Sequence, residues 1–374
     1  MTAVGSVAVI GAGTAGLASA ILLAEAGVAV DLVEISPEIG ALGSGITVQG
    51  NALRVLRRLG VWDEVARLGY AFDAVGLRTP DGTVLAEIPD ARTGGADLPA
   101  TVGMYRPHLT RLLAERAAEL GVKIRAGTAP TALTQDGTGV ELTCSDGSRA
   151  RYDLLIGADG VRSWTRGALG VQLSTRSIGM GIWRAFAPRP ESVTRTDLVY
   201  GGPAFIAGYC PTGPDTLYAY LVEPAQDRST LTPGERLATM RGIADSYHGP
   251  WDEIRESLTD PARVHYTWFE SHLLDGPWHR GRVVLLGDAA HCCPPTLAQG
   301  AAMAMEDAQV LAELLVAADT VDERLWTAFT ERRLARVRAV VDGSVQLCDW
   351  LLAGERGDVP GLMHRISALV TEAP

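Results

Sequence analysis

Apolar residues near the start of the chain change from a strand pattern to a helical pattern and back again. Residues 6–10 (SVAVI) form a short β-branched run, and LASAILLAEAG, which follows GAGTAG, has helical spacing that ends at Gly27. The run VAVDLVE at 28–34 predicts a second strand. A strand, a helix and a strand in this order form the first half of a doubly wound parallel sheet, so we expect an α/β fold.

The same alternation continues along the chain, and hairpin signals are added to it. Residues 51–69 predict two helices divided at Gly60, and 107–121 predict another amphipathic helix. DG turns predict a hairpin within 75–90 and further short strands after the amphipathic helix. The remaining predictions are a strand that ends in a turn over 282–291, a helix over 301–318 and a helical tail.

Aromatic residues are concentrated in one segment of the chain. Twelve of the 22 lie within 173–275, in strand-like runs such as DTLYAYLVE, which predict a mainly antiparallel sheet inserted into the first domain. The predicted first domain comprises 1–72, 101–172 and 276–374, including C-terminal helices, and the second comprises 73–100 and 173–275. Because the two domains interleave in sequence, we expect one functional unit with a cleft between them.

Composition and charge narrow the classes of partner. The 374 residues are 47% hydrophobic and carry a formal net charge of -11, which argues against a nucleic-acid-binding surface. Lys123 is the only lysine, so mechanisms that need several lysines are excluded. Five irregularly spaced cysteines fit a reducing compartment, and the sequence shows neither a signal peptide nor an uncharged apolar run of about 18 residues. We therefore expect a soluble, cytoplasmic protein without nucleic-acid or membrane partners.

The stretch GAGTAG carries the first candidate chemistry. Gly11, Gly13 and Gly16, with Ala15 before the last of them, have the G-x-G-x-x-G pattern between a strand and a helix. Glycines at these positions permit a tight turn, close approach of a pyrophosphate and close helix–strand packing, while the helix N-terminus offers free N–H groups to the anion. Glu34 ends the second strand, where a carboxylate can bind a ribose hydroxyl. The sequence therefore predicts a bound ADP-containing dinucleotide.

Two other strand ends carry an aspartate beside a glycine. In DLLIGADGVRSWTR, Asp159 follows an apolar strand, and we expect Ser163 and Arg166 on its exposed continuation. In GDAAHCCPPTLAQG, Asp288 follows a strand and precedes a helix. An aspartate so placed can accept hydrogen bonds from a sugar alcohol, and the N–H groups of 300–302 would suit a partly anionic ring oxygen. Each motif taken alone also fits an ordinary turn after a strand.

Together, GAGTAG with Glu34, DLLIGADGVRSWTR and GDAAHCCPPTLAQGAAMAMEDA occur in the order of a known family. Over almost its whole length the chain resembles the group A, single-component FAD-dependent aromatic monooxygenases, which include the para-hydroxybenzoate, salicylate and 3-hydroxybenzoate hydroxylases. The resemblance implies an FAD-binding (Rossmann-like) domain with an inserted substrate domain. It also implies that NAD(P)H reduces FAD and that O2 then gives a flavin C4a-hydroperoxide, which hydroxylates an aromatic or heteroaromatic small molecule.

The resemblance assigns roles to residues by position in the motifs. The FAD pyrophosphate would be held by Gly11, Gly13, Ala15 and Gly16. The adenosine ribose would be bound by Glu34. Other residues would contact the rest of FAD: Arg106, Asp159 (which the family also assigns to NAD(P)H), Asp288 at the ribityl chain, and Pro295, Gly300, Ala301 and Ala302 beside the isoalloxazine. Gln299 matches a glutamine near the substrate in some members.

The sequence departs from the family at the group that activates the substrate. Related phenol hydroxylases have a histidine on a substrate-domain strand, whereas FIAGYCP places Gly208 there. Tyr218 and Tyr220 share one strand face by the period-two rule. They are candidates to line the pocket or to deprotonate a substrate hydroxyl, although aromatic residues on strands more often pack in a core.

Neither the spaced histidines nor the adjacent cysteines have the spacing of metal ligands. His265, His272 and His279 are seven residues apart, which matches no metal signature, so we interpret them as ordinary surface or interface residues. The adjacent Cys292 and Cys293 lack C-x-x-C spacing, and we expect a packing role for them. No metal site is predicted.

Other classes explain less of the sequence. A disulfide reductase would have a second nucleotide domain and a cysteine pair near the first helix, and a flavin halogenase would have a W-x-W-x-I-P motif and a placed lysine. A nicotinamide dehydrogenase explains only residues 6–34. The alternatives kept are another FAD-dependent oxidoreductase (halogenase-like or oxidase) and a non-catalytic FAD-binding protein. We expect a monomer or homodimer whose partners are a small aromatic substrate and O2.

Overall fold

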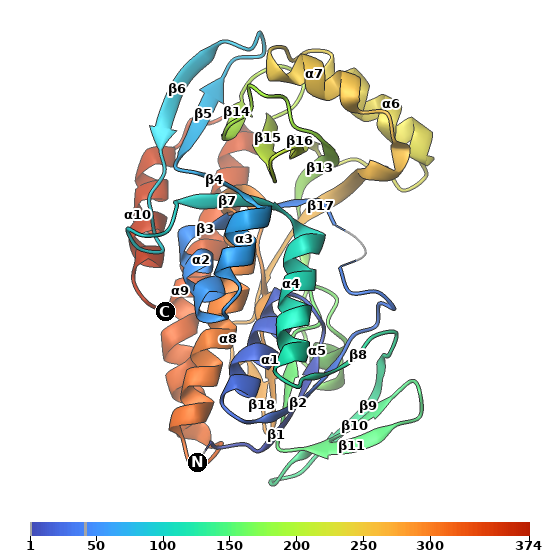
Figure 1. The fold of residues 1–374 in the computed structure, drawn as a ribbon, viewed down its shortest axis with the longest axis vertical. Coiled ribbons are helices and arrows are strands. Elements are labelled where there is room, and N and C mark those ends of the chain that lie inside the picture. Colours follow the sequence, from blue (N-terminus) through green and yellow to red (C-terminus); the bar gives the residue numbers. More distant parts are fainter. Residues whose placement is uncertain (1, 41–42) are drawn as a thin grey trace.

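The computed structural model describes residues 2–40 and 43–374, and Figure 1 shows how its elements are arranged. A six-stranded sheet lies in the lower half of the view and an eight-stranded sheet in the upper half, and each has helices against it. Two three-stranded sheets complete the strands of the described residues.

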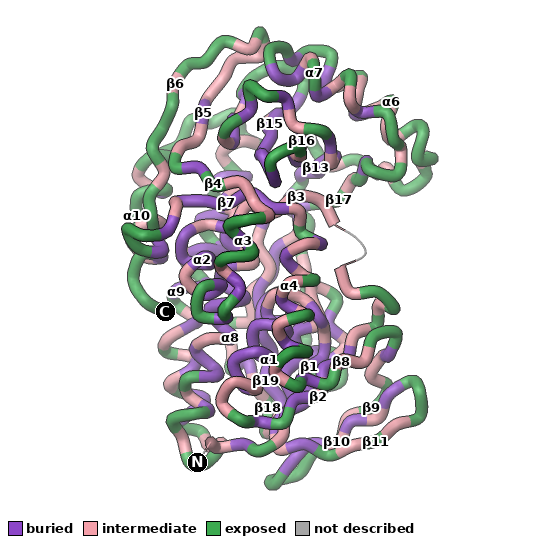
Figure 2. The backbone as a smooth tube through the Cα atoms, viewed as in Figure 1, coloured by how far each residue is buried: buried purple, intermediate pink, exposed green. Residues whose placement is uncertain are grey.

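The six-stranded sheet has the order β18-β19-β12-β1-β2-β8, and all its pairs are parallel except β18 with β19. The strands are β1 (Ser6–Ile10), β2 (Ala29–Val33), β8 (Lys123–Arg125), β12 (Leu154–Gly157), β18 (His279–Arg280) and β19 (Val283–Leu285). Its central strands are continuous apolar runs because helices cover both faces of such a sheet, and Figure 2 shows them buried.

Helices pack in and around this domain, and all of them except the short helix at 164–168 follow the predicted apolar pattern. They are α1 (Thr14–Glu25), α2 (Gly50–Arg58), α3 (Trp62–Leu68), α4 (Arg106–Glu119), α5 (Trp164–Ala168) and α8 (Gly300–Ala317). Helix α1 ends just before Gly27, and the break between α2 and α3 falls at Gly60; both glycines have positive φ angles (82° and 75°), which residues with a side chain rarely adopt. Helix α1 contacts both α4 and α8.

The eight-stranded sheet has the order β20-β17-β13-β16-β15-β14-β5-β6 and is mainly antiparallel; only β5 and β14 pair in parallel. Its strands are β5 (Ala74–Arg78), β6 (Val84–Pro89), β13 (Arg176–Pro188), β14 (Thr196–Val199), β15 (Ile206–Pro211), β16 (Thr216–Pro224), β17 (Val264–Leu273) and β20 (His291–Cys292). The predicted hairpin at 75–90 therefore joins the strands of 173–275 in one sheet. This is the association that the two-domain prediction requires, and the exact domain boundaries stay a prediction.

Two helices that the sequence analysis did not predict cover one face of this sheet. Helices α6 (Pro233–Ala244) and α7 (Pro250–Ser257) pack on it around Trp183, Tyr209 and Trp251. The opposite face lies against the long helix α9 (Glu323–Ala353), where Val345 and Cys348 pack with strand residues. The eight-stranded sheet is thus covered from both sides, and α9 extends from it to α8 (Figure 1).

The remaining elements are two small sheets and the last helix. They are β3 (Gly45–Gln49), β4 (Tyr70–Phe72) and β7 (Thr101–Tyr105), then β9 (Pro130–Gln135), β10 (Val140–Cys144) and β11 (Arg149–Tyr152), and finally α10 (Val359–Thr371). None of the helices within 2–40 and 43–374 is both long and apolar enough to cross a bilayer. The predicted fold, a doubly wound α/β domain with a mainly antiparallel inserted sheet and C-terminal helices, is confirmed.

Candidate active site

The turn between β1 and α1 separates the roles of the three glycines of GAGTAG. A methyl group on Gly11 would lie 2.4 Å from the carbonyl oxygen of Ala158, and one on Gly16 would lie 2.0 Å from the carbonyl oxygen of Gly11. A methyl group on Gly13 would meet no atom within 4 Å. Gly11 and Gly16 are therefore required by packing, whereas Gly13 leaves open space beside the N-terminus of α1, which no side chain caps.

Glu34, just after β2, is bound to the same turn. Its carboxylate accepts hydrogen bonds from the backbone N–H of Ala12 at 2.7 Å and of Ser36 at 2.8 Å. Each bond uses one carboxylate oxygen, so further lone pairs remain to accept bonds from hydroxyl groups. The carboxylate thus fixes the glycine turn and also borders the space that Gly13 leaves open.

Asp159 begins a second motif loop and has partners inside it. Its carboxylate accepts hydrogen bonds from the Ser163 hydroxyl and from the Thr165 N–H (2.8 Å) and hydroxyl (2.9 Å) at the start of α5. The expectation that Ser163 and Arg166 are exposed is wrong, because both are buried. Arg166 turns inward and donates to the carbonyl oxygens of Val161 (2.8 Å) and Ala289 (2.9 Å), and so links the two aspartate-containing loops.

The turn that carries Asp288 is held by buried side chains of other elements. Asp307 of α8 accepts hydrogen bonds from the Gly287 N–H at 3.0 Å and from His291 Nε2 at 2.6 Å, and Arg333 donates to its other oxygen at 2.8 Å. The Asp288 side chain itself is exposed although protein surrounds it on most sides. This partial desolvation raises the pKa of Asp288, and the charges of His291 and Arg106 lower it in part, which places Arg106 near Asp288.

The N-terminus of α8 is a second open helix end. Gln299 precedes the helix without capping it through its side chain, and a methyl group on Gly300 would contact only the Cys293 sulfur, at 3.8 Å. Ala298 has a φ of 52°, so the backbone takes a left-handed turn just before this end. Ala301 and Ala302 follow on the first turn, and Pro295 is exposed beside it. Backbone N–H groups are therefore free here to meet an electron-rich group.

Gln299 is only 1% exposed, and its amide is fully engaged within the protein. Its Nε2 donates to the side-chain oxygens of Gln49 and Asn51, and its Oε1 accepts a hydrogen bond of 3.0 Å from Asn51 Nδ2. Asn51 also donates to Glu306 at 3.0 Å. The structure thus places Gln299 as a link between β3, α2 and α8.

Glu306 is the centre of a buried charge cluster that the sequence analysis missed. Arg333 (3.0 Å) and Arg336 (2.8 Å) of α9 donate to its carboxylate. Burial opposes ionisation of Glu306, but the hydrogen bond from Arg336 and the charge of Arg333 outweigh it and hold its pKa below the ordinary value. The available signal was the adjacent acidic pair Glu306 and Asp307 on the mostly apolar 300–317 and two arginines three positions apart on 323–353.

Tyr218 and Tyr220 lie on one face of β16, as predicted, with ring centroids 5.1 Å apart. Arg184 Nε donates to the Tyr218 oxygen at 3.2 Å. Burial raises the pKa of Tyr218, an effect that Arg184 partly offsets, and burial raises the pKa of Tyr220 well above its ordinary value. Both phenols are therefore protonated at neutral pH, which argues against either acting as a base. A methyl group on Gly208 would lie 2.3 Å from the Tyr220 ring, so that ring fills the place of a side chain at 208.

Strand β3 connects the tyrosines with the α8 end of the site. Gly45 lies against Tyr218, since a methyl group there would be 2.3 Å from the Tyr218 Cβ, and Gln49 contacts Gln299 at the other end. The two contacts are four residue steps apart along β3, which corresponds to roughly 13 Å. The ring of Tyr105, which precedes Arg106, packs at a tilt against the ring of Phe186 on β13, with the two centroids 4.3 Å apart. Strand β3 therefore links the strand of the two tyrosines to the N-terminal end of α8.

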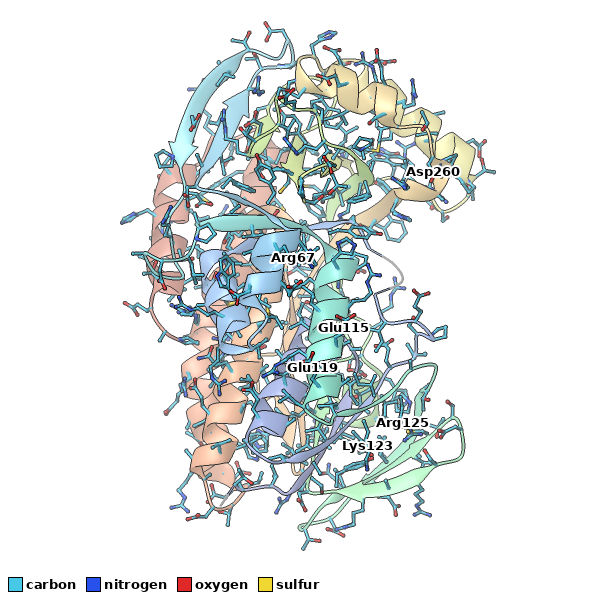
Figure 3. The ribbon with its side chains drawn as sticks, in the orientation of Figure 1. Arg67, Glu115, Glu119, Lys123, Arg125 and Asp260 are labelled. Carbon is cyan, nitrogen blue, oxygen red and sulfur yellow. The ribbon has the colours of Figure 1, made fainter. Side chains whose placement is uncertain are left out.

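Other chemistry suggested by the residue types is not supported. Lys123 and Arg125 lie on the edge strand β8, far below the eight-stranded sheet (Figure 3). Among the described residues, no group of histidine, cysteine and acidic side chains could hold a metal ion. Burial raises the pKa of the Cys293 thiol to about 12 and that of Cys292 above its ordinary value, so both are uncharged thiols. A hollow of about 630 Å³ lies beside β4 and β6 and contains none of the predicted site residues.

A family model described as "FAD binding domain" matches residues 5–344, which is most of the chain. A putative FAD-dependent monooxygenase of Bacillus subtilis, YetM, is 31% identical to this chain, and the alignment covers 93% of this chain and 94% of the YetM chain. The chain belongs to the FAD-dependent monooxygenases. FAD is the cofactor of this family, and NAD(P)H is its typical reductant.

Two further similar proteins are named for a quinolone and for a hydroxypyridine. The 2-heptyl-3-hydroxy-4(1H)-quinolone synthase of Pseudomonas aeruginosa is 32% identical and covers 88% of this chain and 85% of its own. The solved structure of 2-methyl-3-hydroxypyridine-5-carboxylic acid oxygenase is 29% identical, covers 95% of this chain and 93% of its own, and has a TM-score of 0.77. The predicted family and enzyme class are therefore confirmed, and the alternatives of a halogenase-like enzyme, an oxidase and a non-catalytic protein fall away.

Proposed function

We propose that this FAD-dependent monooxygenase uses NAD(P)H and O2 to hydroxylate an aromatic or heteroaromatic small molecule whose ring already carries an oxygen. The observation that carries the proposal is the exposed Asp288, held in a rigid turn and associated with two helix ends that no side chain caps. These groups fit the pyrophosphate, the ribityl hydroxyls and the electron-rich end of an isoalloxazine. When bound, FAD supplies oxygen activation at its C4a position.

The cofactor roles follow from the geometry of the turns. Gly13 leaves room for the pyrophosphate, and Gly11, Ala15 and Gly16 shape the turn and the helix that present N–H groups to it. Glu34 would accept a bond from the ribose. The remaining FAD contacts would come from Arg106, Asp159, Asp288, Pro295, Gly300, Ala301 and Ala302. For Asp159 the contact would use lone pairs that the cap of α5 leaves free.

On the substrate side, we assign Tyr218 as a hydrogen-bond donor. Arg184 donates to a lone pair of the Tyr218 hydroxyl oxygen and leaves the hydroxyl proton free. The phenol can therefore donate a hydrogen bond to an oxygen substituent on the ring of the substrate. Tyr220 would pack its ring on the substrate. The relatives named for a quinolone and for a hydroxypyridine support a nitrogen-containing ring as the first substrate class to test. Gln299 would act by holding β3 and α8 together.

The test is substrate-stimulated oxidation of NAD(P)H by the purified FAD-loaded protein. Hydroxypyridines, quinolones and simple phenols are supplied separately, and the product is analysed for one oxygen atom derived from 18O2. We expect at least one class to stimulate oxidation and to gain a labelled hydroxyl group. Tyr218→Phe should lower this stimulated rate, whereas Tyr266→Phe, on the opposite face of the sheet, should not. Failure of every class to stimulate oxidation contradicts the proposal.

A further inference from the structure

His272 is a buried histidine for which the proposed function has no role. It lies near the end of β17 and pairs with Cys292 of β20, so it faces the segment that carries Asp288. Only 5% of its surface is exposed. Its Nε2 lies 2.9 Å from the backbone carbonyl oxygen of Asp288, and its Nδ1 lies 2.7 Å from the hydroxyl oxygen of Thr175. Of the two expected settings, surface or interface, His272 has the second, because both ring nitrogens have partners inside the protein.

The partners of His272 determine its tautomer. A carbonyl oxygen can only accept, so Nε2 must carry the proton and donate it to Asp288. Nδ1 then accepts a hydrogen bond from the Thr175 hydroxyl. Burial lowers the pKa of His272 to about 4; the bond to the Asp288 carbonyl opposes this, and the charges of Arg166 and His291 add to it. The ring is therefore neutral and held in one orientation at physiological pH.

Within residues 2–40 and 43–374, three side chains anchor the backbone of the turn around Asp288, and one of the three comes from the eight-stranded sheet. Asp307 of α8 holds the Gly287 N–H, and Arg166 of α5 holds the Ala289 carbonyl. His272 holds the carbonyl of Asp288 itself. His272 therefore couples the eight-stranded sheet, which carries Tyr218 and Tyr220, to the backbone of Asp288.

We propose that His272 is a positioning residue, which fixes the backbone of Asp288 so that its carboxylate is oriented to bind the ribityl hydroxyls of FAD. The proposal rests on the role given to Asp288 in the proposed function. A donor lost from a buried carbonyl leaves that carbonyl unsatisfied and lets the turn relax. The effect should therefore appear as weaker FAD binding and should depend on the Asp288 side chain.

Two polar substitutions of similar size separate positioning from general stability. The amide nitrogen of Gln at position 272 can take the place of Nε2, whereas that of the shorter Asn lies near the place of Nδ1 and faces Thr175. We expect His272→Gln to retain FAD affinity within about threefold and His272→Asn to lose about tenfold. Affinity is measured by titrating FAD into the full-length apoprotein and following flavin fluorescence. His265→Asn, at an exposed position of the same strand, is the matched control and should have no effect.

A double-mutant cycle decides the mechanism. If His272 acts through Asp288, then His272→Asn causes no further loss of FAD affinity in the Asp288→Ala background. An equal loss in both backgrounds overturns the proposal, as does an unchanged affinity of either His272→Asn or Asp288→Ala alone. Thermal unfolding of the apoproteins shows which variants are folded, and loss of the fold in both His272→Gln and His272→Asn also overturns the proposal. Because the readout is FAD binding, absence of substrate hydroxylation would defeat the proposed function while leaving the result for His272 in place.

Discussion

Single residues of the glycine turn can be assigned separate physical roles. Gly11 and Gly16 are required by contacts within the protein, whereas Gly13 faces open space. The strand–turn–helix conformation around the motif was predicted correctly, because its spacing encodes a local turn, and the cofactor roles of the glycines stay a prediction. The sequence could not predict that Ser163 and Arg166 are buried, because their burial depends on the carbonyl oxygens of distant residues, among them Ala289.

We expect Gly13→Ala and Gly16→Ala to have opposite profiles. A methyl group on Gly13 has room in the protein, so the free energy of unfolding of the apoprotein should change by less than about 1 kcal/mol while FAD affinity falls at least about tenfold. A methyl group on Gly16 overlaps the Gly11 carbonyl and should destabilise the apoprotein by about 1–3 kcal/mol or more. Denaturant unfolding and FAD titration measure the two effects. Equal destabilisation by both substitutions would contradict the assignment.

The protonation of the two tyrosines gives a pH prediction. Because burial raises the pKa of both phenols above their ordinary value of 10.0, the neutral form persists through the physiological range and beyond it. Tyr218→Phe and Tyr220→Phe should therefore remove no titration below pH ~10 from the pH–rate profile, even where they lower the rate. Ultraviolet titration of phenolate formation provides the independent measurement. A phenolate that forms near pH 7 in either position would show that the tyrosine can act as a base.

Elements held together by local patterns were predicted, and those that depend on distant partners were not. Helices α1, α2, α3, α4 and α8 follow apolar spacing and were predicted. Helices α6 and α7 were missed although α6 begins with a visible capping box, in which Thr232 and Glu235 exchange hydrogen bonds. The cluster of Asn51, Gln299, Glu306, Arg333 and Arg336 joins three separate segments, so no local spacing indicates it.

Glu306→Gln should strongly destabilise the contact between α8 and α9. The substitution leaves Arg333 and Arg336 buried beside an uncharged amide, and breaking a buried pair in this way costs about 3–5 kcal/mol. Glu313→Gln on the same helix removes an exposed pair with Arg332 and should cost less than about 1 kcal/mol. Denaturant unfolding of both variants gives the comparison, and similar losses would contradict the role of the cluster.

The same carboxylates predict how stability responds to acid. The pKa values of Glu306 and Asp307 lie below their ordinary values of 4.5 and 3.8 in the folded protein. A lowered folded pKa contributes stability above the ordinary pKa, and this contribution is lost as the pH falls through the folded value. Wild-type protein should therefore lose stability more steeply below pH ~4.5 than Glu306→Gln does. Thermal unfolding measured between pH 6 and pH 3 tests this difference.

At the scale of the whole molecule, α9 joins parts that interleave in sequence. It contributes Val337 and Val340 to the core around the six-stranded sheet and Val345 and Cys348 to the core beneath the eight-stranded sheet. Arg336 also binds backbone carbonyls at the end of α10. The sequence predicted two interleaved domains, but helical periodicity alone could not show that one helix serves both.

This arrangement predicts that the two sheets unfold together. Because α9 cannot leave one core without disturbing the other, the apoprotein should show one cooperative calorimetric transition, with equal calorimetric and van't Hoff enthalpies. Addition of FAD should raise the midpoint of that single transition rather than separate it into two. Two transitions, with only one sensitive to FAD, would show that the sheets are energetically independent.

The packing of Tyr220 over Gly208 restricts the order in which this site can change during evolution. A histidine introduced at 208 alone would overlap the tyrosine ring, and removal of the ring alone would leave a gap opposite a glycine. The two positions therefore form an epistatic pair. An exchange of a larger side chain at 208 for the present Gly208–Tyr220 arrangement, one substitution at a time, passes through a variant with either an overlap or a cavity. Engineers who want a histidine base here should exchange both residues in a single step.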